Sequence, residues 1–323
     1  MKNILVTGSS GFIGTNLMAF LLEQNNYNVL GIDLVVPKIN SHTDFWKKND
    51  IREKKSLLKI FSEFKPNIVI HLGAKTDLNG VNLNYYNANS DGVSNLIEVI
   101  AQVGSVERVI FASSMYVCVP GYKPNSNEDY KPHTIYGESK VLTEEIIKNS
   151  LLLDKNVWSI VRPTSIWGPW FGEPYKNFFD IVLSGKYMHM GTKACMKTYG
   201  YIDNTIFQLI KIINSPKEKI HKKGCYVGDY EPYHISDWAD EIASYANLKI
   251  PKVPYTFFKA LAFFGDLLKL AKIKFPMTTF RLKNMTTNNV HELSLIKEIA
   301  GNLPVSRIEG VKQTVDWIKK NNL

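Results

Sequence analysis

Hydrophobic positions in the first half of the chain alternate between short continuous runs and longer segments with a helical repeat. Continuous apolar runs predict buried strands at residues 2–6, 27–32, 67–72, 108–112 and 157–161. Segments with an apolar residue every three or four positions predict helices at residues 12–21, 54–64, 90–103 and 136–149. This alternation is typical of a doubly wound α/β fold, because crossover helices bury both faces of a parallel sheet.

The alternation loosens beyond residue 162, where glycine, proline and aromatic residues become frequent. Apolar segments at 199–213 and 224–227 indicate that the chain then returns to the sheet. We therefore expect a sheet domain at 1–167 with a returning segment at about 198–246. Residues 168–197 and 247–323 are expected to form a smaller substrate lobe.

Residues 255–275 are the most apolar helical segment of the chain. A membrane-spanning helix needs about twenty residues that are nearly free of charge. This segment is interrupted by Lys259, Asp266, Lys269 and Lys272, so we expect no membrane span. We predict that its broad apolar face packs on the protein, and binding to a membrane surface is the alternative.

Three glycines, Gly8, Gly11 and Gly14, lie between the first strand and the first helix. Such glycines allow a sharp turn, a close approach of backbone amides to phosphates, and tight packing of helix on sheet. The second strand ends at Asp33, where a carboxylate can accept both hydroxyls of an adenosine ribose and repel a 2′-phosphate. Taken alone, the glycines could simply form a turn, and Asp33 could be an ordinary surface residue. Together they predict a Rossmann-type site that selects NAD over NADP.

Tyr136 and Lys140 are four residues apart and therefore share one face of a helix. The ammonium, together with a positive nicotinamide ring, would favour the phenolate and make Tyr136 a proton acceptor near neutral pH. Lys140 could also anchor the nicotinamide ribose. Ser114, just after the strand at 108–112, is expected to hydrogen bond the reacting oxygen. Either Ser113 or Ser114 could instead satisfy backbone groups at the strand end.

Composition narrows the possible environment and partners. The net charge is +9, but the lysines are scattered and form no basic stripe with interleaved aromatic residues, so we expect no nucleic-acid partner. The three cysteines, Cys118, Cys195 and Cys225, include no C-x-x-C pair. This pattern favours a reducing compartment and gives no sign of a metal site or a disulfide framework. The first residues lack a signal-peptide pattern, and we expect a cytoplasmic protein.

Together these motifs resemble the NAD-dependent epimerase/dehydratase family of extended short-chain dehydrogenases/reductases, whose members mostly modify nucleotide-linked sugars. The resemblance covers essentially the whole chain, including the segments 71–74 and 162–169 and the closing segment 303–317. It implies a catalytic set of Ser114, Tyr136 and Lys140. It implies cofactor contacts from Gly8, Gly11, Phe12, Ile13, Gly14, Asp33, Asp50, Ile51, Leu72, Gly73, Ala74, Lys75, Asn89, Ser113, Tyr136, Lys140 and Pro163. The substrate contacts that it implies are Thr76, Ser114, Ser165, Lys197 and Arg281.

The chain also departs from the family pattern. Dehydratases of the family carry acidic residues directly after the catalytic hydroxyl, whereas Met115 and Tyr116 follow Ser114 here. Lys197 replaces a frequent diphosphate-binding arginine, and a lysine contacts phosphate as a point charge.

The resemblance and its departures favour an NAD-dependent nucleotide-sugar 4-epimerase that works through a transient 4-keto sugar and forms a homodimer. The alternatives are an NAD(P)-dependent nucleotide-sugar 4-ketoreductase and a non-catalytic dinucleotide sensor. The partner implied in each catalytic case is a nucleotide-diphosphate sugar.

Overall fold

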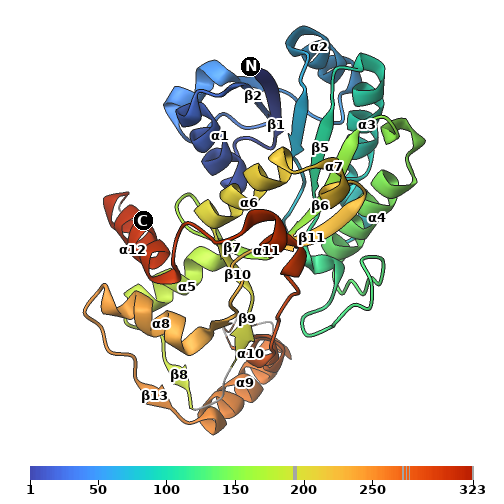
Figure 1. Ribbon diagram of the computed structural model, residues 1–323. Coiled ribbons are helices and arrows are strands. Elements are labelled where there is room, and N and C mark those ends of the chain that lie inside the picture. Colours follow the sequence, from blue (N-terminus) through green and yellow to red (C-terminus); the bar gives the residue numbers. More distant parts are fainter. Residues whose placement is uncertain (192–194, 271–272, 274, 276, 322–323) are drawn as a thin grey trace.

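A seven-stranded parallel sheet organises the larger part of the molecule (Figure 1). The computed structural model describes residues 1–191, 195–270, 273, 275 and 277–321. The strands follow the spatial order β11-β6-β5-β4-β1-β2-β3. Their bounds are β1 Lys2–Thr7, β2 Tyr27–Asp33, β3 Trp46–Lys48, β4 Ile68–His71, β5 Arg108–Ala112, β6 Val157–Pro163 and β11 Lys223–Val227. The order reverses between β1 and β4, so these two neighbouring strands lead to opposite halves of the sheet.

Helices cover both faces of this sheet because alternate strand residues enter two separate cores. In β1, Ile4 and Val6 join one core while Leu5 joins the other, and all three are fully buried. The first core includes side chains of α1 (Phe12–Gln24) and α6 (Ile202–Asn214). The second includes side chains of α2 (Lys54–Phe64), α3 (Asp91–Val103) and α4 (Ile135–Asn149). Burial on both faces explains the continuous apolar runs in the sequence.

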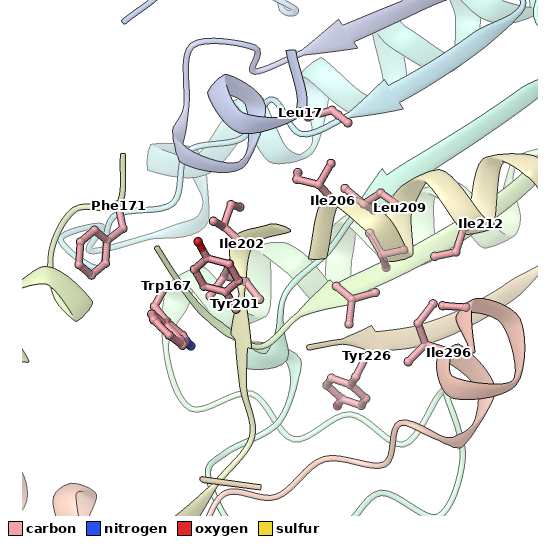
Figure 2. Close-up of a cluster of buried hydrophobic side chains, with 14 of the residues drawn as sticks. Leu17, Trp167, Phe171, Tyr201, Ile202, Ile206, Leu209, Ile212, Tyr226 and Ile296 are labelled. Carbon is pink, nitrogen blue, oxygen red and sulfur yellow. The ribbon is translucent and has the colours of Figure 1, made fainter. Parts of the chain in front are cut away.

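Figure 2 shows the core on the α6 side of the sheet. Ile202, Ile206, Leu209 and Ile212 recur at helical spacing along α6 and are almost completely buried. Leu17 of α1 belongs to the same cluster, as does Ile296 of α11 (Ser294–Ala300), which packs against α6 and β11. The C-terminal part of the chain is thereby attached to the sheet edge.

A smaller lobe projects below the sheet in Figure 1. Three two-stranded ladders pair β7 with β10, β9 with β12, and β8 with β13. The bounds of these strands are β7 Ser165–Trp167, β8 His189–Met190, β9 Met196–Lys197, β10 Tyr199–Tyr201, β12 Tyr233–His234 and β13 Lys252–Val253. The remaining helices are α5 Tyr175–Leu183, α7 Lys217–Ile220, α8 Ile235–Ser244, α9 Tyr255–Leu270, α10 Thr279–Thr286 and α12 Arg307–Lys320. Short 3-10 helices are η1 Asn40–Phe45, η2 Leu83–Asn89, η3 Met115–Val117 and η4 Leu151–Leu153.

The doubly wound α/β fold expected from the sequence is confirmed. The short edge strand β3 was not expected, and it pairs in parallel with β2. Helix α9 begins at the expected residue, and residues 271, 272, 274 and 276 of the expected segment lie outside the described residues. In the described part of the chain, no helix is both long and apolar enough to cross a bilayer. The division into sheet domain and substrate lobe stays a prediction.

Candidate functional site

The loops after β1 and β4 lie side by side where the strand order reverses. Gly73 donates its amide to the Thr7 hydroxyl at 3.0 Å, and Leu72 donates to the Thr7 carbonyl at 3.1 Å. Gly8 has a φ of +70°, and a Cβ atom there would lie 2.6 Å from the Gly73 nitrogen. Only glycine therefore fits at residue 8. In open α/β sheets this crevice, at the carboxyl ends of the strands, is where ligands bind.

The glycine loop and the start of α1 form a cradle for an anion. A Cβ atom on Gly14 would lie 2.1 Å from the Gly8 carbonyl oxygen, so the first turn of α1 presses directly on the loop. Gly11 is the N-cap of α1, and the first turn contains no acidic residue. Because first-turn amides have no partner within a helix, those of Phe12 and Ile13 suit a pyrophosphate.

Asp33 stands at the end of β2, next to this cradle. Its two carboxylate oxygens accept the amides of Ser10 at 3.0 Å and Val35 at 3.1 Å, which fixes the orientation of the group. A carboxylate has further acceptor positions, which a ribose diol can use. The side chains around the crevice therefore fit NAD.

Asp50 and Ile51 lie beyond Asp33, along the expected adenine side of the crevice. The Arg52 guanidinium hydrogen bonds the Asp50 carboxylate and lowers its pKa, so this carboxylate is already paired. The Ile51 side chain packs over Gly92, where a Cβ atom would come within 2.7 Å of it. Gly92 is thus required by packing against Ile51.

The three expected catalytic side chains converge at the end of β5. The Thr134 hydroxyl accepts the Gly137 amide at 3.0 Å and caps α4, which places Tyr136 in the first turn. The Ser114 hydroxyl lies close enough to the Tyr136 phenol to lower its pKa. One turn further along α4, the Lys140 ammonium donates to the Ala112 carbonyl at 2.8 Å. The structure therefore brings Ser114, Tyr136 and Lys140 together.

The chain by itself does not favour a phenolate at neutral pH, and the expectation that Lys140 and the nicotinamide ring together favour it stays a prediction. Burial raises the pKa of Tyr136 to about 12, although the Ser114 hydroxyl acts in the opposite direction. Burial also lowers the pKa of Lys140 to about 8. Removal of the phenolate from water thus outweighs the stabilisation that the chain provides. The positive charge that a phenolate needs has to arrive with the cofactor.

Aromatic side chains surround the Tyr136 ring, and sequence reasoning did not identify them. Ring centroids of Tyr86 and Tyr116 lie 5.9 Å and 5.7 Å from that of Tyr136. The Tyr175 phenol donates to the Ser165 hydroxyl at 3.0 Å, and burial raises the pKa of Tyr175, so that this phenol stays neutral. For Tyr116, its position two residues after Ser114 was the available signal. These rings limit the access of water to the phenol.

A buried ion pair lies behind the catalytic residues. Arg162 of β6 donates to both carboxylate oxygens of Glu144 on α4, at 2.8 Å each. Burial alone would raise the pKa of Glu144, but hydrogen bonds and charge from Arg162 outweigh it and the pKa is lowered. The Ser113 hydroxyl also acts on the Glu144 carboxylate. The Ser113 hydroxyl is buried and makes no hydrogen bond with the described residues.

Asn89 positions the loop that follows β4. Its side-chain oxygen accepts the Lys75 amide at 2.8 Å, and its side-chain nitrogen donates to the Lys75 carbonyl at 3.0 Å. The same nitrogen donates to the Ser139 hydroxyl at 3.0 Å, which ties the loop to α4. Asn89 thus holds Leu72, Gly73, Ala74 and Lys75 in place, while the next residue, Thr76, is exposed.

Two of the expected substrate residues, Lys197 and Arg281, lie in and beside α10, away from the main sheet. The Lys197 ammonium donates to the Asn284 carbonyl in α10 at 3.0 Å, and burial lowers its pKa. Arg281 lies on α10 three residues before Asn284, hence near the same face of the helix, and it is exposed. Asn289 connects this region to the catalytic residues, because its side-chain nitrogen lies 3.9 Å from the Met115 sulfur.

Two further expected residues, Pro163 and Ser165, lie at the end of β6 and at the start of β7. Pro163 ends β6 and pairs with Val227 of β11. The Ser165 hydroxyl is buried and lies 3.8 Å from the Met115 sulfur, next to Ser114 in sequence. Both residues therefore border the region of Ser114 and Tyr136.

Comparisons with known proteins agree with this geometry. Residues 4–222 match the family model of the NAD dependent epimerase/dehydratase family. N-acetyl-alpha-D-glucosaminyl-diphospho-ditrans,octacis-undecaprenol 4-epimerase of Escherichia coli O157:H7 is 24% identical over 98% of this chain and 95% of that protein. UDP-glucose 4-epimerase of Neisseria meningitidis serogroup C is 31% identical over 50% of this chain and 51% of that protein.

Solved structures share the fold. UDP-glucose 4-epimerase from Thermotoga maritima, determined with UDP-glucose, superposes with a TM-score of 0.77 at 21% identity, covering 99% of this chain and 100% of that one. The family match spans about two thirds of the chain, including the glycine loop, Asp33 and the catalytic helix. The chain therefore belongs to the NAD-dependent epimerase/dehydratase family of enzymes, and NAD is its cofactor.

Proposed function

We propose that this protein is a 4-epimerase of a hexose carried on a diphosphate, with a nucleotide as the carrier expected from the sequence. One observation carries the proposal: the Ser114 hydroxyl lies close enough to the Tyr136 phenol to lower its pKa, Lys140 is fixed one helical turn away, and no carboxylate directly follows the serine. This site can move a proton on and off a sugar hydroxyl. It lacks the acidic residues that elimination of water requires at this place.

NAD, when bound, supplies a group that takes up and returns the hydride of a sugar carbon. The residues of the chain act on the sugar hydroxyl. Tyr136 takes the hydroxyl proton and later returns it, and Ser114 hydrogen bonds the same oxygen. The aromatic rings around Tyr136 exclude water and so protect a 4-keto sugar while this sugar rotates in the site.

Lys197 and Arg281 are the residues that would hold the diphosphate while the keto sugar rotates. A 4-epimerase has to present both faces of the keto sugar to one cofactor, so the hexose needs to rotate while its carrier stays bound. Lysine suits this role because it binds phosphate as a point charge without fixing one geometry. The link from Lys197 to α10 places this charge on the lobe side of the site.

Dehydration has less support from the residues beside Ser114. Met115 has no ionisable group, and burial raises the pKa of Tyr116, so its phenol stays neutral. The relatives named above support epimerisation, because they are 4-epimerases of sugars linked to a diphosphate. Their carriers differ, since one name specifies UDP and the other a polyprenol.

The test supplies purified enzyme with UDP-glucose, UDP-N-acetylglucosamine or GDP-mannose and no added reductant. A 4-epimerase converts one epimer into an equilibrium mixture, which proton NMR resolves, with only substoichiometric NADH present. Tyr136→Phe is the matched negative control. Stoichiometric oxidation of added NADH by a 4-keto sugar nucleotide, without interconversion of epimers, would establish the ketoreductase instead. Tight NAD binding with no turnover of any sugar would indicate the sensor.

A further inference from the structure

Helix α9 carries apolar side chains on two opposite sides. One side is packed: Phe258 and Ala262 are buried with Leu282 of α10 in a small core. The apolar side chains of the other side are exposed. In Figure 1, α9 lies at the opposite end of the molecule from α2. We call this side the outer face of α9, and its residues are Phe257, Phe263, Phe264 and Leu267.

The outer face is a contiguous exposed apolar surface. Phe263 and Phe264 lie six and seven residues after Phe257, and Leu267 lies three residues after Phe264. These intervals are close to one or two helical turns, so the four side chains share one side of the helix. Phe263 is 64% exposed, and the other three are each about half exposed, from 48% to 54%. Isolated exposed apolar residues are ordinary, but three exposed phenylalanines and a leucine on one helix face indicate a binding surface. The sequence-based expectation that α9 packs on the protein is met by its other side only.

The charge around this face is strongly positive. Residues 249–283 contain seven lysines and one arginine but a single acidic residue, Asp266. Lys259 and Lys269 lie on α9 itself, and Lys283 on α10; all three are exposed. Aromatic and aliphatic residues on one helix face with flanking lysines are the pattern of helices that lie in the interface of an anionic membrane. A second copy of this chain is a poor match for the face, because it would bring the same positive charge.

A groove separates α9 from α10. It has a volume of about 490 Å³. Its lining includes Lys259 at one end and Thr286 and Thr287 at the inner end of α10. Thr287 is two residues from Asn289, whose side chain contacts Met115 beside Ser114. The groove therefore lies on the side of α10 that is joined, through the segment up to Asn289, to the surroundings of Ser114.

We propose that the outer face of α9 docks on the surface of an anionic lipid bilayer, and that the docked enzyme acts on sugar diphosphates carried by a membrane lipid as well as on nucleotide-linked ones. The docking stands on the exposed face and its charge alone. The assignment of a lipid carrier rests in addition on the proposed function. The apolar side chains enter the interfacial region of the bilayer, while the lysines remain at the level of the headgroups.

The docking is tested by sedimentation of the full chain with vesicles of phosphatidylcholine and phosphatidylglycerol. We expect binding to these vesicles, weaker binding at high salt, and weaker binding to phosphatidylcholine alone. The double variant Phe263→Ser/Leu267→Ser should bind at least about tenfold more weakly, because it withdraws two apolar side chains from the interface. Both side chains are largely exposed, so the fold should persist, as circular dichroism can verify.

The matched control is Leu151→Ser, which removes a leucine that is 81% exposed on η4, a segment that packs against α3. This variant should bind vesicles like the wild type. Equal binding by wild type and the α9 double variant, or equal loss in the Leu151 control, would overturn the docking. A wild-type chain that does not sediment with anionic vesicles would do the same. Loss of a dimer in the double variant without vesicle binding would identify the face as an interface between copies instead.

Activity measurements separate the docking from the proposed function. The double variant should epimerise a soluble UDP-hexose at the wild-type rate but turn over a polyprenyl-diphosphate hexose in anionic vesicles at least about tenfold more slowly. An equal rate on the vesicle-bound substrate would overturn the lipid-carrier assignment. Vesicle binding by a wild-type chain that epimerises neither substrate would leave the docking intact and contradict the proposed function.

Discussion

The buried pair of Glu144 and Arg162 should stabilise the part of the sheet that carries the catalytic helix. Their side chains are 0% and 1% exposed, and the Tyr130 hydroxyl donates a further hydrogen bond to Glu144 at 2.7 Å. Glu144→Gln keeps the shape of the side chain but leaves the guanidinium charge without compensation in a dry environment. Breaking a buried pair in this way costs about 3–5 kcal/mol of unfolding free energy.

This cost translates into a measurable shift in melting temperature. For 323 residues the entropy of unfolding at the midpoint is about 0.7 kcal/mol/K, so the variant should melt about 4–7 °C lower than the wild type. Urea unfolding followed by circular dichroism measures the free energy, and calorimetry measures the midpoint. Glu145→Gln, at the exposed neighbouring position on α4, is the matched control and should change stability little.

The double variant Glu144→Gln/Arg162→Met adds a second check. Removal of the uncompensated charge should restore part of the lost stability, since apolar replacement of both partners is often neutral. Acid should also reduce the difference between wild type and Glu144→Gln. The pKa of Glu144 is lowered in the folded chain, so its contribution is present above the unfolded value and is lost as the pH falls through the folded value. A Glu144→Gln variant as stable as Glu145→Gln would refute this account of the pair.

Three further predictions concern the catalytic and cofactor residues. Tyr136→Phe should retain NAD binding but lower turnover by about a hundredfold or more, and near-normal turnover would remove Tyr136 from the mechanism. Asp33→Ser should weaken NAD binding and strengthen NADP binding, both measured by calorimetry; a wild type that prefers NADP would contradict the role of Asp33. Burial lowers the pKa of Lys140 from 10.5 to about 8, so the unfolded chain binds more protons at this residue between those pH values. The cofactor-free wild type should therefore gain stability relative to Lys140→Met as the pH rises through this window, and parallel stability curves would count against the assignment.

The sequence predicted most of the main sheet because its strands are buried on both faces and therefore read as unbroken apolar runs. Strand β3 lacks that signal: it has three residues, two of them lysines, and exists because Trp46 pairs with Gly31 of β2. The glycine motif could also be predicted from the sequence, because its residues contact one another: a Cβ atom on Gly14 would collide with the carbonyl oxygen of Gly8. The expected homodimer stays a prediction.

What the sequence could not provide depends on contacts between distant segments. The pKa of Tyr136 is set by burial among side chains that include Tyr86 of η2 and Tyr116 of η3, with a smaller opposite effect of the Ser114 hydroxyl. The role of Asn89 depends on the loop around Lys75, fourteen residues earlier in the chain. For α9, the pattern showed that the helix is apolar, but only the packing of Phe258 against α10 reveals which side is covered.

The central claim is that the site inverts a sugar carbon by removing and returning the same hydride. The most direct measurement uses a UDP-hexose carrying deuterium at C4, incubated with purified enzyme in ordinary water without added reductant. The account predicts that the epimer formed retains deuterium at C4 and that the sugar keeps its full oxygen content, as mass spectrometry and NMR can determine. Loss of the deuterium to solvent during epimerisation, or a product that has lost water, would contradict it.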